Sequence, residues 1–187
     1  MMYISKGAIL LAYGRDRIVV NRCGCDHILN GDMAEAWLDG RFDVATTREE
    51  RMTQAIQRLE GMGLVEMSED ETDITRYRLL QNCVICPARQ TAPRAMLGPK
   101  ERCVWKWIKG AGFKLRISEL VLLAEKGVKP DPSLFGKNNW QTLVDMIYTT
   151  ETIFDGILDT NMERSPARSV TADAVLGLLH KKRILLV

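Results

Sequence analysis

Residues 47–67 have the sequence TREERMTQAIQRLEGMGLVEM, and this stretch decides the fold of the N-terminal half. Its apolar side chains recur at i, i+3, i+4 and i+7 and form one stripe: Met52, Ala55, Ile56 and Leu59. Thr46 or Thr47 is the expected N-cap, and the glycines at 61 and 63 are typical of a helix end. We therefore predict an amphipathic helix from about Thr47 to Met62, followed by a strand at Leu64–Met67.

The residues on either side of this helix predict a small sheet. Upstream, the apolar run Ala8–Tyr13, a turn and the β-branched run Ile18–Val20 are typical of a hairpin. A short helix is expected between this hairpin and the long helix, over residues 32–40. Downstream, a polar turn at 68–73 leads to a predicted returning strand at Arg76–Leu80. A helix that runs into a strand, a loop and a second strand is typical of a winged helix.

A stretch with three prolines, at 87–99, predicts a linker that divides the chain into two units. The first, residues 1–86, is expected to be winged-helix-like. The second, residues 100–187, is expected to be mostly helical, with helices near 100–109, 118–126, 139–159 (broken near Thr149) and 171–182 and a strand at 184–187. Residues 174–186 match residues 55–67 in apolar pattern. This match indicates either a common helix–strand junction or a degenerate second winged helix. The predicted fold class is α+β.

Composition and charge limit the classes of function. The chain has 187 residues and a net charge of +2, with −2 on residues 1–99 and +4 on residues 100–187. Neither half is basic enough to require nucleic acid as a partner. The longest apolar run, Ala8–Tyr13, is far shorter than the roughly 18 residues of a membrane span. No export signal is visible, so we expect a cytoplasmic protein with reduced cysteines and no membrane partner.

The sequence carries no motif of a known class of catalytic site. Phosphate-binding glycine loops, a nucleophile elbow and a zinc-protease helix are all missing. Only two histidines occur, and His180 stands beside three cations at a predicted helix end, where a structural role is expected. We therefore expect a protein that is not an enzyme.

Four of the five cysteines form two close pairs, Cys23 with Cys25 and Cys83 with Cys86. Two such pairs leaving one sheet are compatible with a structural zinc site, with His27 as a substitute ligand. The alternatives are idle thiols that behave as small apolar side chains, or a redox or iron–sulfur role. We keep zinc as the one cofactor that the sequence suggests.

A winged helix predicts DNA binding as one function. The long helix would present Arg48, Arg51, Gln54 and Arg58 to DNA or to another partner. The predicted wing, however, carries five acidic residues, Glu66, Glu69, Asp70, Glu71 and Asp73, which repel a polyanion. The alternative for the arginines is a solvated helix face. A DNA-binding transcriptional regulator is therefore the second function that the sequence suggests.

Residues 8–67 resemble the PqqD-like peptide-recognition domains of peptide-modifying systems. The resemblance rests on the hairpin, Ile28-Leu29-Asn30, the helix ending in Leu38-Asp39-Gly40, and the final helix running into Gly63-Leu64-Val65. It implies binding of a precursor peptide along the third strand and the last helix of that domain. On this sequence it implies Ile18, Val19 and Val20 as peptide-binding residues, by strand addition. A peptide- or protein-recognition subunit is therefore the function that we expect first, with its ligand, partner enzyme and oligomeric state left open.

Overall fold

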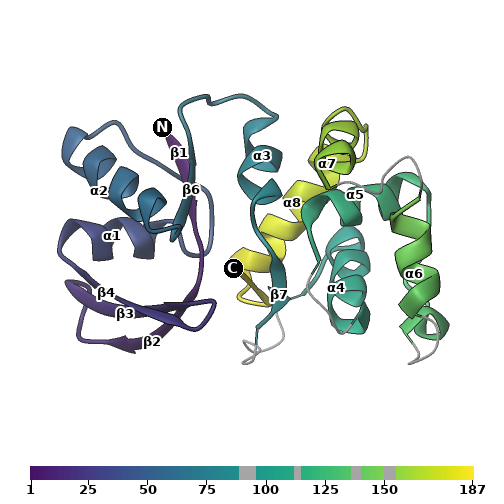
Figure 1. Cartoon of the computed structure of the whole chain (residues 1–187), viewed down its shortest axis with the longest axis horizontal. Helices are drawn as coiled ribbons and strands as arrows, with labels where there is room; N and C mark the ends of the chain where they lie inside the picture. The colour runs from purple at the N-terminus through teal and green to yellow at the C-terminus, as the bar shows by residue number, and fades with distance from the viewer. Residues whose placement is uncertain (89–95, 112–114, 136–139, 150–154) are drawn as a thin grey trace.

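The computed structural model describes residues 1–88, 96–111, 115–135, 140–149 and 155–187 and has a mixed α+β fold (Figure 1). The elements of the N-terminal part are β1 (Met2–Ser5), β2 (Ala8–Ala12), β3 (Arg17–Arg22), β4 (Cys25–Asn30), α1 (Asp32–Asp39), β5 (Ala45–Thr46), α2 (Glu50–Gly61) and β6 (Val65–Ser68). Those of the rest are α3 (Thr75–Gln81), β7 (Ile85–Pro87), α4 (Pro99–Ala111), α5 (Ile117–Glu125), η1 (Pro132–Phe135), α6 (Trp140–Ile147), α7 (Asp155–Glu163), α8 (Arg168–His180) and β8 (Ile184–Leu186). The predicted α+β class is confirmed. No helix among these described residues is long and apolar enough to cross a membrane.

The predicted hairpin is confirmed, but it belongs to a three-stranded antiparallel meander with the order β2-β3-β4. The turn between β3 and β4 has positive φ at both central residues, 52° at Cys23 and 89° at Gly24. This is the type I′ geometry whose twist matches that of the flanking strands. Because such a turn contains only two residues, it fixes the β3–β4 register from its first pair, Arg22 with Cys25.

Helix α2 is confirmed with the predicted stripe inside the core. Met52, Ala55, Ile56 and Leu59 are all buried. The helix begins at Glu50 rather than Thr47, and no side chain caps it. The Thr47 hydroxyl instead accepts a hydrogen bond from the Glu49 amide at 3.2 Å, which shapes the turn that enters the helix. A second three-stranded sheet, in the order β5-β1-β6, packs beside this helix.

The predicted returning strand of the wing is wrong, because residues 75–81 form helix α3. Strand β6 pairs instead with β1, antiparallel, with Tyr3 opposite Met67. Helix α3 packs against α8, α5 and β6, so its buried residues cover more than one side: Thr75, Tyr77, Leu79 and Leu80. The resulting alternation of Arg76, Tyr77, Arg78 and Leu79 imitates a strand in the sequence. The N-terminal part therefore has the hairpin and two helices of the prediction without its second wing strand.

The predicted helices of the second half are confirmed to within a few residues as α4, α5, α6, α7 and α8. The expected break near Thr149 separates α6 from α7, and residues 150–154 lie outside the described residues. The closing strand is β8, which pairs with β7 through Cys86 and Leu185. Most of the predicted linker at 87–99 also lies outside the described residues, between β7 and α4.

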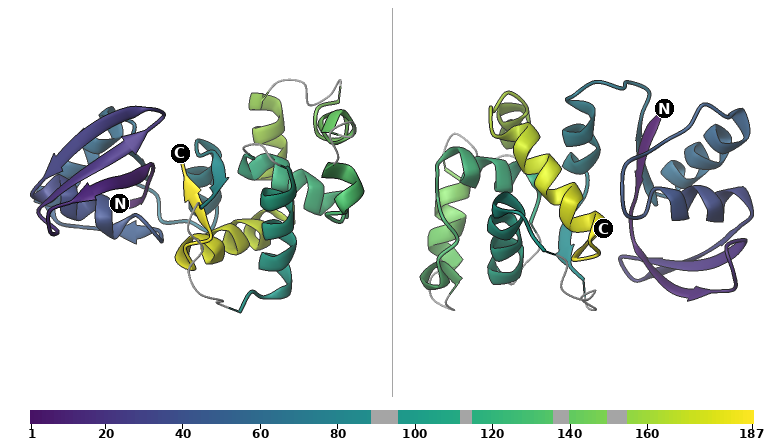
Figure 2. Two further views of the ribbon diagram at one scale, coloured as in Figure 1. Left: turned by 90° about the horizontal axis from the view of Figure 1, so that it is seen from below. Right: turned by 180° about the vertical axis from the view of Figure 1, so that it is seen from behind.

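Buried apolar side chains form two core clusters. The parts of the chain that contain them lie side by side in Figures 1 and 2. The sheet core consists of Tyr3, Ile18, Val20, Leu29, Ala34, Ala36, Trp37, Met52, Ala55, Ile56, Leu59, Leu64 and Val65. The helical core consists of the buried apolar residues between Tyr77 and Leu186, together with Ile4. Because α3 and β7 contribute to the helical core, the packing changes from one core to the other between β6 and α3, before the proline-rich stretch.

The two segments with matching apolar patterns share a local geometry. After α2, the Leu64 amide donates to the Leu59 carbonyl at 2.8 Å; after α8, the Arg183 amide donates to the Leu178 carbonyl at 2.9 Å. The residue before each donor has positive φ, 70° at Gly63 and 56° at Lys182. Both are helix ends of the Schellman type. The match therefore extends to the turn between helix and strand, while β8 pairs with β7 and β6 with β1.

Candidate functional site

Strand β3 cannot be the strand to which a peptide adds, because it is the central strand of its sheet. Ile18 and Val20 point into the sheet core and are fully buried. Val19 points outward but is flanked by Leu11 on β2 and Ile28 on β4. The expectation that a peptide adds as a strand beside Ile18, Val19 and Val20 is therefore wrong, because both backbone edges of their strand are already paired.

The edges of this sheet are β2 and β4, and β4 is the third strand of the meander. The type I′ turn makes Arg22 and Cys25 a hydrogen-bonded pair, and such pairs alternate along an antiparallel ladder. The backbone N–H and C=O groups of Asp26, Ile28 and Asn30 therefore point away from β3. No backbone hydrogen bond from another described segment reaches them. These three residues form a regular open edge, which we call the β4 edge.

The polar face of α2 lies at one end of the β4 edge. A small hollow of about 200 Å³ is lined by Asn30 and α1 on one side and by Arg51, Gln54 and Arg58 on the other. Arg51 forms ion pairs with Asp32 at 3.2 Å and with Glu35 at 3.9 Å. The structure thus brings three of the four predicted helix residues together beside a strand edge, whereas Arg48 precedes the helix and does not line the hollow.

The outer face of the same sheet is apolar and open to solvent. Leu11, Val19 and Ile28 are cross-strand neighbours on this face, and Ile28 is 55% exposed. Three of the eight large apolar side chains that are exposed among the described residues belong to this sheet, Leu10, Leu11 and Ile28, and a fourth, Tyr13, directly follows β2. Exposed apolar side chains that cluster in this way are typical of an interaction surface.

The acidic residues of the predicted wing have two different environments. Glu66 lies on β6 and forms an ion pair with the buried Lys6. Glu69, Asp70, Glu71 and Asp73 are exposed in the loop between β6 and α3, where Glu71 lies 3.5 Å from the N-terminal amino group. This loop therefore presents mainly negative charge to any ligand.

The four paired cysteines do not converge on a metal site in the described part of the chain. Cys23 and Cys25 are exposed at the β3–β4 turn, while Cys83 is buried at the end of α3 and donates to the Leu79 carbonyl at 3.2 Å. Burial raises the pKa of the Cys83 thiol to about 12, so this thiol is protonated at neutral pH in the metal-free chain. Among the described residues, no group of three or more Cys, His, Asp and Glu side chains could hold a metal ion.

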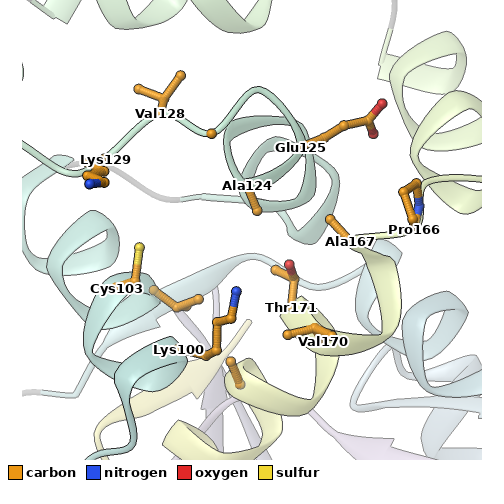
Figure 3. Close-up of a pocket in the computed structure, with 13 residues that line it drawn as sticks. Lys100, Cys103, Ala124, Glu125, Val128, Lys129, Pro166, Ala167, Val170 and Thr171 are labelled. Carbon is orange, nitrogen blue, oxygen red and sulfur yellow. The ribbon is translucent and has the colours of Figure 1, made fainter.

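A largely apolar cavity of about 510 Å³ lies in the helical part, between α4, the end of α5 and the start of α8. In Figure 3 the Lys100 amine, the Cys103 thiol and the Thr171 hydroxyl point toward its centre, whereas the Glu125 carboxylate points away. Sequence reasoning missed this cavity, because its lining comes from three segments that are far apart in the chain.

Comparison of the chain with protein-family models, with curated proteins and with solved structures found no match.

Proposed function

We propose that this protein is a non-enzymatic peptide-recognition subunit that binds an extended peptide as an additional strand along the β4 edge. The carrying observation is the set of three outward-facing backbone N–H and C=O pairs at Asp26, Ile28 and Asn30. Backbone groups of this kind supply affinity in strand addition, and side chains beside the strand supply selectivity. Ile28 and the hollow between α1 and the polar face of α2 would provide that selectivity.

The opposite edge is less suited to this role. Strand β2 contains a bulge at Leu10, where the register shifts between Ile9 and Leu11. A bulge twists an edge and interrupts the spacing of its backbone groups. The resemblance to the PqqD-like domains supports the same choice, since it implies binding at the third strand and the last helix. It also suggests a precursor peptide, presented to a partner modifying enzyme, as the ligand. The exposed thiols of Cys23 and Cys25 fit a reducing cytoplasm.

The decisive experiment removes one hydrogen-bond donor from the β4 edge. The Ile28 amide points away from β3, so Ile28→Pro preserves the internal ladder while it blocks an added strand. We expect a random peptide library displayed on phage to yield a consensus on the wild-type chain, and the selected peptide to lose most of its affinity for Ile28→Pro. Ile28→Val, which keeps the amide, should bind nearly as well.

The matched control is Ala12→Pro, which places proline at an outward-facing position of the opposite edge. It should leave peptide affinity unchanged. Loss of binding in Ala12→Pro but not in Ile28→Pro would refute the assignment to β4. Failure of the library to yield any consensus would refute peptide recognition itself.

DNA binding is the second candidate, supported by the exposed Arg48 and Arg58. Arg51 is the weaker contributor, because Asp32 and Glu35 already compensate its charge. A fluorescence anisotropy titration with a random-sequence duplex distinguishes the two functions. DNA binding through several phosphates would weaken steeply with added salt and fall in Arg48→Ala/Arg58→Ala, whereas peptide binding along a strand edge should depend on salt only weakly.

A further inference from the structure

A groove of about 610 Å³ lies where the sheet core and the helical core meet. Its walls include the start of β2, Phe42, the end of β7 and strand β8. Figures 1 and 2 show the end of the β3–β4 hairpin turned toward β7 and the C-terminal strand. The Gly7 amide donates to the Leu186 carbonyl at 2.8 Å and so joins the two parts beside this groove. The groove is separate from the β4 edge: it is lined by β2, and β4 is the opposite edge strand of the same sheet.

Two strand edges face this groove with backbone groups that their own sheets do not use. Val84 and Val187 exchange both backbone hydrogen bonds, so the alternation along the ladder turns the Ile184 N–H and C=O away from β7. On β2, the pairing of Ala8 with Asn21 likewise turns the backbone of Ile9 away from β3. The side chains of Ile9, Leu10 and Leu185 give the groove apolar walls.

Arg41 is the polar group that distinguishes this groove from an ordinary gap between two cores. Its guanidinium stacks on Phe42, 4.5 Å from the ring centroid, and lies 5.6 Å from the Trp37 ring. The Nε atom is buried and has no hydrogen-bond partner among the described residues. Burial also lowers the pKa of Arg41 from its ordinary value, a sign that the charge is incompletely solvated.

A second cation reinforces the charge at this place. The Lys182 amine lies 4.9 Å from the centroid of the Phe42 ring, so both cations contact the same aromatic side chain. Neither aspartate nor glutamate is among the described residues that line the groove. A partly desolvated guanidinium without a counter-charge is strongly complementary to a planar anion, which it can bind through two parallel hydrogen bonds.

We propose that the groove between the two cores binds a ligand with an apolar body and a carboxylate, and that Arg41 binds the carboxylate. Lys182 adds long-range attraction, and the apolar walls contact the body of the ligand. This chemistry has two sources: the C-terminal end of a peptide, which could also use the strand edges at Ile9 and Ile184, or a free aliphatic acid.

The test is a calorimetric titration of the full chain with three probes. These are an N-acetylated tripeptide of leucine and valine with a free carboxylate, the same tripeptide as its C-terminal amide, and octanoate. We expect the free-acid tripeptide or octanoate to bind, and the amide to bind at least about 10-fold more weakly than its acid. Tighter binding of the tripeptide acid identifies a peptide end as the source, and tighter binding of octanoate identifies a free acid.

Arg41→Met should weaken the better acid probe by about 10- to 100-fold, the range of a charge-assisted hydrogen bond, and Lys182→Met by less. Arg17→Met is the matched control, because Arg17 also stacks on an aromatic ring, Tyr13, but lies outside the groove. Equal affinity of acid and amide, no binding of either acid, or an Arg41→Met variant with wild-type affinity would overturn the proposal. If Arg41→Met does not fold, the comparison of acid with amide and the Lys182→Met variant still decide it. Ile28→Pro should leave all these affinities unchanged, so this site and the β4 edge are tested independently.

Discussion

Two helix–strand segments of this protein, α2–β6 and α8–β8, have the same apolar pattern and the same turn but different surroundings. Helix α2 buries one stripe and exposes its polar face to the hollow beside β4. Helix α8 is buried over most of its length, because α3, α4 and α5 all pack against it. The comparison teaches that the local pattern specifies the helix and its end, while the neighbouring elements decide whether a face is available for binding.

The largest expected effect comes from exchanging residue types between equivalent positions of the two helices. Gln57 is exposed on α2, and its equivalent in the matched segments is the buried Leu176 on α8. Leu176→Gln should lower the free energy of unfolding by about 3 kcal/mol, because it removes apolar contacts and buries an amide. Gln57→Leu should change it by less than about 0.5 kcal/mol. Urea denaturation measures both, and effects of similar size would contradict the difference in surroundings.

The two cores should also respond differently to alkaline pH. In the helical core, burial raises the pKa of Cys83 from 9.0 to about 12 and that of Tyr77 from 10.0 to about 12. In the sheet core, burial raises the pKa of Tyr3 from 10.0 to about 12. Below pH 9 these groups are neutral in the folded and the unfolded chain. Above it the unfolded chain ionises first, so stability is lost as the pH rises toward 12.

For Cys83 this loss is on the order of 1.4 kcal/mol per pH unit between pH 9 and 11. Urea midpoints measured across this range should therefore fall, and Cys83→Ala should reduce the slope. A Cys83→Ala variant with the wild-type slope would show that the thiol is not buried as the structure has it. Tyr3→Phe serves as the control for the sheet core, since its contribution begins only above pH 10.

The smallest effect concerns the positive φ at the two helix ends. Gly63 adopts it without strain, whereas Lys182 adopts the same conformation with a side chain. Lys182→Gly should therefore raise the free energy of unfolding by up to about 1 kcal/mol. Gly63→Ala should lower it by about 1–2 kcal/mol, because a Cβ there would also collide with the Arg22 guanidinium. Thermal denaturation of the Lys182→Gly and Gly63→Ala variants measures both effects. A stabilising Gly63→Ala would show that the two turns differ.

Much of this fold can be predicted from the sequence, because α2 and the hairpin each bury one face with a regular period. Helix α3 could not be predicted in this way. Because it packs against other elements on several sides, its apolar residues do not recur with a helical period. Strand β4 was missed because Cys25–Asn30 contains aspartate and asparagine, which are uncommon in strands. Without β4, nothing in the sequence shows that β3 is central. The strand predicted to bind a peptide was therefore β3, the neighbour of the open edge strand β4. The spacing alone places Arg51, Gln54 and Arg58 on one side of a helix, as the structure has them, whereas Arg48 lies before the first residue of α2.

The bulge at Leu10 has a consequence for self-association. An edge that accepts a foreign strand also accepts the same strand of another molecule, and antiparallel pairing of two β4 strands would create a dimer with two-fold symmetry. Growth of this sheet beyond two copies would need the full length of β2 as the next template, and the irregular backbone at Leu10 disfavours it. One extra residue in a short strand thus favours pairing of two copies over continued growth of this sheet.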